Sequence, residues 1–380
     1  MYSTAIRIFT NVVLIAMLPN SVLYASDNVD YKGQLSGEYV GIYNAHTTQN
    51  YLGLRYIPDL TLRKNLSPEK VWDGNISANT YTSYQSHSDE NYDSSAKIYR
   101  LNTRYETAQS EIQVGLQHIN FGPAVLLRSL RWFDQVSPTD PLKLTQGVKG
   151  IRYRYFMMNN ANLWLWTLYG NSEPKGYERI ASKDNTPEVG ARYQFPLSSG
   201  EMGLSFHVRK TEKMGFTGDF VGRDLVEKRF ALDGKWDIGP GVWFEYVTIN
   251  QGAAERDNNW LSMLSLGSDY TFDYGNGIYT LLEHMISAQS ENVTGWDDQV
   301  QTSAFQMSYP VNILDAVSLL VFYSWQQQQV FQYARWSRTY DNWAINLSVF
   351  LSSREDYPVA GATATGMLGD GVQLMIIYNH

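Results

Sequence analysis

The feature that most constrains this chain is a period-two alternation of apolar and polar residues that recurs from about residue 33 onward. Leu52, Leu54 and Tyr56, for example, alternate with Gly53 and Arg55. A period of two places alternate side chains on opposite faces of a strand, whereas a helix would show a period of 3.6. Since no comparable helical period persists, the chain is predicted to be all-β. Further alternating runs lie at 111–117, 150–157, 189–195, 202–208, 230–238 and 343–351.

The connections between these runs alternate in length. Short turns and long polar loops on opposite ends of the strands are typical of outer-membrane barrels. We therefore predict a transmembrane, antiparallel, up-and-down β-barrel of about 18 strands with both termini at the short-turn end. A count of 16 is the alternative, because the facing of three runs is ambiguous (34–43, 278–288 and 331–339). The short connections are 158–160, 198–200, 239–241, 274–277, 311–315 and 340–342, and the long ones are 84–95, 121–146, 171–186, 211–227, 252–259, 289–298 and 353–368.

The composition agrees with a barrel in a membrane. The chain has 27 Tyr, 11 Trp and 15 Phe, yet its mean hydropathy is −0.34. A barrel needs apolar residues only at every second strand position and gathers aromatic residues at the two membrane interfaces, whereas a helical membrane protein would be far more apolar. A Tyr-rich soluble sandwich would also fit the composition alone. The absence of Cys excludes disulfides and thiol chemistry.

The first residues predict export. Arg7 precedes a short apolar run at 12–18, and Leu23-Tyr24-Ala25 offers a cleavage site. We therefore expect a signal peptide at 1–25 and an outer-membrane barrel at 26–380 in a Gram-negative cell. Outer-membrane lipid, lipopolysaccharide and the barrel-assembly machinery are the expected partners. The net charge of −8 gives no reason to expect nucleic acid.

The last run also bears on assembly. Val372, Leu374, Ile376 and Tyr378 alternate with polar or mixed neighbours up to His380. An alternating final strand resembles the assembly signal of outer-membrane proteins, which usually ends in an aromatic residue. The alternative is an ordinary closing strand.

The alternation assigns several arginines to the inside of the barrel. Charges facing lipid would be costly, so Arg55, Arg100, Arg104, Arg152 and Arg154 are predicted to face the lumen. Such residues are candidates for lining the pore and would favour anions. Alternatively, they pair with lumen-facing carboxylates and only brace the wall.

The longest loop, 121–146, is the candidate constriction. Its segment Ala124–Phe133 follows Pro123 and is predicted to form a short amphipathic helix. Arg128 and Arg131 would share one face of that helix, and leucines would cover another. We expect the apolar face to pack on the inner wall and the two arginines to narrow the pore. A lid on the outer rim or a helix at the membrane interface is the alternative.

The segments on either side of this loop resemble a known family. Gln113–Gly122, then Asp140-Pro141-Leu142, then Gly147–Tyr153 are similar to the strand, loop and strand of alginate-export-type and related large monomeric outer-membrane barrels. The resemblance implies an 18-stranded exporter or porin with Arg152 and loop residues lining the pore. Gln113 stands where the family usually has a basic residue, so the resemblance does not extend to a specificity for anionic polysaccharides.

No residue pattern indicates catalysis. The six His lie in no motif that brings Ser or carboxylate partners beside them, and no metal-binding or cofactor-binding spacing occurs. The sequence therefore predicts a non-enzymatic channel or porin for the passive passage of small polar or anionic solutes. The alternative function is a structural or interaction barrel whose loops bind a partner protein or a surface glycan.

Overall fold

The computed structural model describes residues 28–43, 48–86, 91–178, 180–211, 225–252, 259–352 and 369–380, and these form 18 β-strands without a helix. In the described part of the chain, no helix has the length and apolar character needed to span a bilayer. The strands are β1 (Val29–Tyr43), β2 (Thr48–Ser67), β3 (Lys70–Gln85), β4 (Tyr92–Glu106), β5 (Ser110–Gln117), β6 (Val148–Phe156), β7 (Asn162–Leu168), β8 (Glu188–Leu197), β9 (Gly200–Thr211), β10 (Leu225–Asp237), β11 (Gly241–Asn250), β12 (Trp260–Phe272), β13 (Ile278–Ser290), β14 (Asp298–Pro310), β15 (Asp315–Ser324), β16 (Gln329–Thr339), β17 (Trp343–Ser352) and β18 (Asp370–Asn379).

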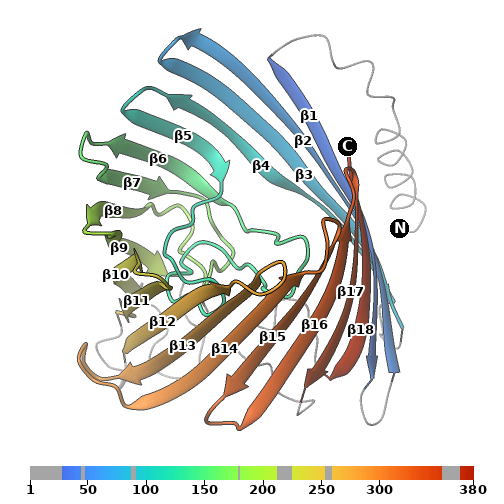
Figure 1. Cartoon of the computed structure of the whole chain (residues 1–380). Coiled ribbons are helices and arrows are strands. Elements are labelled where there is room, and N and C mark those ends of the chain that lie inside the picture. The colour runs from blue at the N-terminus through green and yellow to red at the C-terminus, as the bar shows by residue number, and fades with distance from the viewer. Residues whose placement is uncertain are drawn as a thin grey trace.

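Each strand pairs antiparallel with its sequence neighbours, and the sheet closes on itself (Figure 1). Closure comes from β1 and β18, which pair from Gln34 opposite Asn379 to Tyr43 opposite Asp370. A closed antiparallel sheet has no free edge and satisfies its backbone groups between strands, as a barrel in a membrane must. The predicted 18-stranded antiparallel barrel is confirmed.

The two faces of the wall follow the predicted alternation. On β5, Ile112 and Val114 lie on the outer face and are 41% and 40% exposed. Glu111, the residue before Ile112, is buried on the inner face. On β6, Ile151 is exposed outside and Arg152 is buried inside. On these two strands Ile112, Val114 and Ile151 thus belong to the outer surface, and Glu111 and Arg152 point into the lumen.

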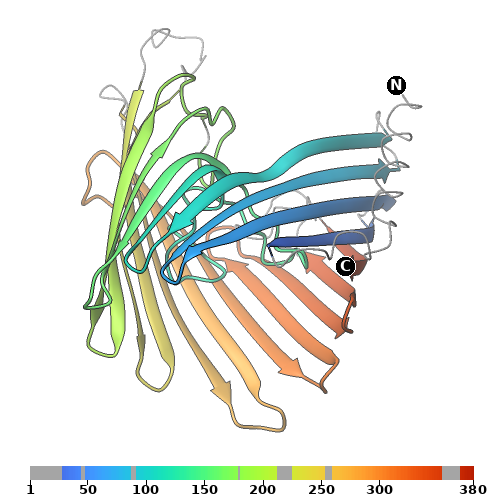
Figure 2. The same cartoon turned by 90° about the horizontal axis from the view of Figure 1, so that it is seen from above.

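The connections also follow the predicted asymmetry. The end that carries both termini has short turns, such as 68–69, 107–109 and 198–199. The opposite end has the long connections, of which 118–147 between β5 and β6 is the longest described. Figures 1 and 2 show this segment folded into the barrel interior. We call residues 118–147 the inward loop.

The predicted helix over Ala124–Phe133 is wrong, because this part of the inward loop is irregular. The backbone N–H groups of residues 124–127 donate hydrogen bonds to the carboxylates of Glu245 and Glu283 on the barrel wall. In a helix, the first backbone N–H groups have no partner within the helix and need other acceptors. Here the two wall carboxylates accept these N–H groups while the backbone is irregular.

Candidate functional site

The inward loop is anchored to the wall by Glu283 of β13. The Glu283 carboxylate accepts hydrogen bonds from the backbone nitrogens of Val125 at 2.7 Å, Leu126 at 2.8 Å and Leu127 at 2.6 Å. The Trp243 indole Nε1 donates a fourth bond at 3.0 Å. Glu283 is completely buried. With four hydrogen bonds to its carboxyl group, this residue holds the loop at one point of the wall.

A second buried carboxylate, Glu245 of β11, holds the loop on either side of that point. It accepts hydrogen bonds from the backbone nitrogens of Ala124 at 3.0 Å and Leu130 at 2.9 Å. Gly122 approaches the same carboxylate with a φ of +95°, and a Cβ there would lie 2.3 Å from Glu245 Oε1. Only glycine fits this approach without displacement of the carboxylate.

The apolar side chains of the loop cover the inner wall. Leu126 and Leu127 are buried in a cluster with Trp243, Leu281 and Phe322. The following residues Leu130, Trp132 and Phe133 enter a second cluster with the inner faces of β6 to β12. The loop therefore lies in the lumen and occupies one side of it.

A second loop, 169–187 between β7 and β8, interlocks with the first. The Tyr177 hydroxyl donates to the Arg128 carbonyl at 2.7 Å, and the Arg131 guanidinium lies 4.2 Å from the centre of the Tyr177 ring. Gly176 adopts a φ of +53°, and a Cβ there would lie 1.9 Å from the Arg131 carbonyl oxygen. The alternation of connection lengths predicts this loop outside the barrel, and no pattern in the sequence indicated its contact with the inward loop. The glycine beside a tyrosine was the only local sign of a close backbone approach.

Most arginines on the β8 to β10 side of the lumen are paired with carboxylates. Arg192 makes two bonds to Asp233, at 2.6 and 2.8 Å. Glu178 of the second loop lies 2.6 Å from Arg229 and 3.1 Å from Arg209. These side chains are buried, so their ion pairs connect the wall strands to one another and to the second loop.

The predicted loop arginines are likewise engaged. Arg128 is buried and lies 3.3 Å from Asp134, and it also donates to Asn120. Although burial opposes the ionisation of Asp134, hydrogen bonds from His118 and Arg128 and their charges keep its pKa below the usual value. Arg131 stacks on Tyr177, whose own pKa is raised by burial. Both arginines lie in the lumen within the packed body of the loops.

Three of the predicted wall arginines meet around one carboxylate. Glu111 of β5 lies 2.7 Å from Arg152, 3.5 Å from Arg104 and 3.9 Å from Arg154. Arg104 also pairs with Asp73 at 2.7 Å. Arg104 lies 3.5 Å from Glu106 as well, so the three arginines face three carboxylates and their charges balance.

Among the predicted wall arginines, Arg55 and Arg100 form no ion pair with a carboxylate of the described residues; the loop residue Arg131, stacked on Tyr177, likewise forms none. Arg55 donates to the Asn79 side chain at 2.9 Å and lies 4.5 Å from the centre of the Tyr81 ring. Arg100 donates to the Thr145 carbonyl at 3.2 Å and lies 4.0 Å from the Tyr99 ring centre. Their positive charge is therefore left to interact with whatever occupies the lumen.

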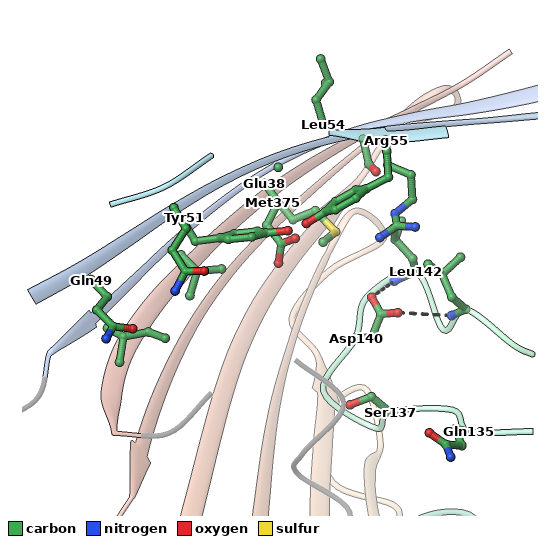
Figure 3. A pocket seen from close by; sticks show the side chains of 17 residues that line it. Glu38, Gln49, Tyr51, Leu54, Arg55, Gln135, Ser137, Asp140, Leu142 and Met375 are labelled. Carbon is green, nitrogen blue, oxygen red and sulfur yellow. Dashed lines mark hydrogen bonds between the residues drawn. The ribbon is translucent and has the colours of Figure 1, made fainter. Parts of the chain in front are cut away.

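A cavity of about 530 Å³ remains between the inward loop and the wall formed by β1, β2, β3 and β18. We call it the axial cavity. Arg55 and Glu38 line it from the wall, and Gln135, Ser137 and Asp140 line it from the loop. Figure 3 shows Arg55 and Asp140 on facing sides of this space. Asp140 is held by the backbone nitrogens of Leu142 at 2.9 Å and Leu144 at 3.2 Å, so its position is fixed.

Metal-ligand geometry and Ser–His contacts are the two arrangements to check for chemistry in the described residues. They contain no group of three or more His, Cys, Asp or Glu arranged to hold a metal ion. The outer face carries one Ser–His contact, His284 Nδ1 to Ser303 Oγ at 2.9 Å. The neighbouring Glu283 points into the lumen, so it does not orient this histidine as a catalytic third group would.

Comparison with known proteins supports the fold. No protein-family model and no curated protein matches the sequence. Among solved structures, OccK2 (OpdF) of Pseudomonas aeruginosa is 10% identical with a TM-score of 0.59, covering 92% of this chain and 97% of its own. OccAB2 of Acinetobacter baumannii is 9% identical with a TM-score of 0.57, covering 93% and 98%. OmpF of Salmonella typhi, solved in complex with daunomycin, is 11% identical with a TM-score of 0.51, covering 94% and 99%. At such identities the likeness concerns the fold, and the chain has the closed antiparallel barrel of outer-membrane porins.

Proposed function

We propose that this protein is a passive channel of the outer membrane for small polar or anionic solutes. The observation that carries the proposal is the axial cavity, which the inward loop leaves open against the wall between Arg55 and Asp140. A barrel of about 18 strands is too wide for side chains alone to fill, so a loop is needed to narrow it. The inward loop narrows the lumen on one side only.

The lining of the axial cavity suits hydrogen-bonding solutes. Arg55 offers a guanidinium without a carboxylate partner, and Glu38 and Asp140 offer acceptors on the other sides. A charge in a narrow, poorly screened passage acts strongly on a permeating group. We assign anionic groups of the solute to Arg55 and donor groups to the two carboxylates.

The other arginines serve the channel from further away in this proposal. Arg128 and Arg131 hold the inward loop in the shape that leaves the axial cavity. Arg104, Arg152 and Arg154 pair with Asp73, Glu106 and Glu111 and brace the wall around Glu111.

Localisation and partners form part of the same proposal. Residues 1–25, which lie outside the described part, would be the signal peptide, and insertion would require the barrel-assembly machinery. Outer-membrane lipid and lipopolysaccharide would surround the apolar outer face. The resemblance to alginate-export-type barrels is kept as a proposal at family level. The channel would need no cofactor and would not be an enzyme.

Single-channel recording in a planar bilayer tests the function. We expect discrete current steps in KCl, and a reversal potential in a salt gradient that reports the preference between anions and cations. A correctly folded barrel that carries no current would contradict the proposal, and would favour a barrel whose loops bind a partner protein or glycan.

A further inference from the structure

The barrel wall has unequal height around its circumference. β4 has 15 residues, but the strands that follow it are short, with 8 residues in β5, 9 in β6 and 7 in β7. A strand needs about 9–11 residues to cross the apolar part of a membrane. The wall at β5 and β7 therefore falls short of a full crossing, and its rim has a notch at the loop end.

The upper part of β4 forms one side of this notch. β4 pairs with β5 only from Leu101 opposite Leu116 to Glu106 opposite Glu111. Residues 93–98 continue to pair with β3 but lie beyond the pairing with β5, and every one of them is exposed. An interior strand of a closed barrel is normally paired on both sides. This stretch of β4 is thus a local edge within the wall.

The inward loop and the second loop only partly close the notch. Arg100 and Tyr99 of β4 contact Thr145 of the inward loop. Farther out, Lys97 meets Glu173 of the second loop at 3.6 Å, with both side chains highly exposed. An exposed ion pair of this kind contributes little to stability, so this contact is easily opened.

A cavity of about 670 Å³ occupies the notch, and we call it the notch cavity. Arg100 and Gln135 line it from the lumen side. Ile98 and Leu116 line it too, although both belong to the outer face of the wall, where Ile98 is 61% exposed. The notch cavity thus extends across the thickness of the wall. It adjoins the axial cavity, because Gln135 and Leu144 line both.

The notch cavity combines apolar and charged side chains. Its outer side carries Ile98 and Leu116 together with the exposed Lys97 and Lys149. Its inner end holds Arg100, whose guanidinium has no carboxylate partner among the described residues. An anionic headgroup with an attached apolar chain complements this arrangement, because its head would reach the arginine while its chain stayed in the membrane.

We propose that the notch is a lateral portal between the lumen and the outer leaflet, and that it admits single-chain anionic amphiphiles. The headgroup lies against Arg100, and the chain passes over Ile98 and Leu116. This inference rests on the proposed function, because it assumes a solvated lumen. It adds a sideways route through the wall and a second class of solute, the anionic amphiphiles.

Fluorescence quenching from within the membrane tests the portal. The chain has no Cys, so Gln146→Cys places a single bimane label in the notch cavity. Vesicles that contain the labelled protein receive lysophosphatidate with a long brominated acyl chain, or lysophosphatidylcholine with the same chain. Both lipids reside in the bilayer, so they reach the label sideways. We expect the anionic lipid to quench at a roughly tenfold lower membrane concentration, as one contact to a charged group would produce.

Three variants of the labelled protein separate charge from folding. Arg100→Gln should remove the advantage of the anionic lipid, whereas Arg100→Lys should retain most of it. Arg63→Gln, at the exposed far end of β2, serves as the matched control and should change nothing. Equal quenching by both lipids in the parent protein would overturn the portal, as would an unchanged preference in a properly folded Arg100→Gln barrel.

The conductance of each variant, recorded separately, keeps the two proposals apart. Selective quenching without current would support the portal and contradict the axial channel. Current without selective quenching would support the channel and contradict the portal.

Discussion

At the scale of single residues, the arginines of the lumen differ by whether a carboxylate neutralises them. Arg192 lies against Asp233, and Arg229 lies against Glu178 and Glu227, so their fields are cancelled locally. Arg55 in the axial cavity forms no ion pair among the described residues, although the carboxylates of Glu38 and Asp140 line the same cavity. A solute in that cavity therefore meets all three charges, of which Arg55 is the positive one.

We expect Arg55→Glu to shift the selectivity of the channel toward cations. The change reverses two units of charge, and unit charges about 4 Å apart interact by roughly 1–4 kcal/mol depending on the effective dielectric. Even the lower value changes relative permeability several-fold, which the reversal potential in a KCl gradient measures. Arg63→Glu at the exposed end of β2 is the control, because solvent screens that position. Equal shifts from both variants would mean that Arg55 does not line the passage.

Asp134 gives a pH-dependent prediction. Its pKa is lowered in the folded loop, so its contribution to loop stability is complete above the usual aspartate value near 4 and is lost as the pH falls through the lowered value. We expect steady single-channel current down to about pH 4 and increasing current noise below it.

The variant Asp134→Asn should show that noise already at neutral pH, because Arg128 then lacks its partner. Asp184→Asn in the exposed part of the second loop should behave like the parent protein. A quiet Asp134→Asn channel would show that this ion pair does not hold the loop.

At the scale of elements, the inward loop is stable without regular structure because the wall satisfies its backbone. Glu245 and Glu283 together accept five backbone N–H groups from residues 124–130. Buried donors without acceptors would each cost about 1–3 kcal/mol, so these carboxylates decide where the loop lies.

We expect Glu283→Ala to release the loop while the barrel still forms. Three backbone donors and the Trp243 indole lose their acceptor, and water that enters the lumen replaces it only in part. The open-channel conductance should rise and fluctuate more than that of the parent protein. Glu201→Ala at an exposed position of β9 is the matched control. A normal conductance for Glu283→Ala would show that the loop is held by its apolar contacts alone.

At the scale of the whole molecule, closure by β1 and β18 removes the last open edge of the sheet. The seam carries a group of aromatic rings, with Tyr378 and Trp343 at 4.6 Å and Tyr378 and His380 at 6.0 Å between ring centres. His380 also exchanges two backbone hydrogen bonds with Gly33, at 3.0 Å each. The final residues thus close the barrel as well as end its last strand.

A closed barrel predicts behaviour that is simple to measure. The protein should sediment with the outer-membrane fraction, and it should migrate at different apparent masses on gels before and after boiling, because its inter-strand bonds resist detergent until heated. A soluble protein with a single gel band would contradict the membrane assignment.

Assembly should depend on the aromatic seam. We expect Tyr378→Asp to reduce the amount of folded barrel in the membrane several-fold, because a charge would replace an aromatic ring on the lipid-facing side. The heat-modifiable band gives the measurement, and Asn379→Asp at the neighbouring exposed position is the control. Equal levels for all three proteins would show that the terminal pattern does not guide assembly.

The sequence by itself determined the class of fold, a strand count of about 18 with 16 as the alternative, and the face of the side chains in the clearly alternating runs. These properties depend on local patterns, since the alternation around Leu52–Tyr56 or Ile112–Leu116 assigns each residue to one side of a strand without reference to its neighbours in space. It also predicted that the loop after β5 turns inward, because its leucines needed a surface to cover.

Only the tertiary structure decided what the lumen contains. The bond from Val125 to Glu283 joins residues 158 positions apart, and the hold of Tyr177 on Arg128 links two loops. The helix prediction was wrong because it rested on local helix propensity alone. Carboxylates distant in the sequence accept the backbone N–H groups of this segment in an irregular conformation. Arg55 and Arg192 look alike in sequence, but only the closed barrel determines which of them meets a carboxylate. That pairing depends on register and loop position across the lumen, which no local pattern encodes.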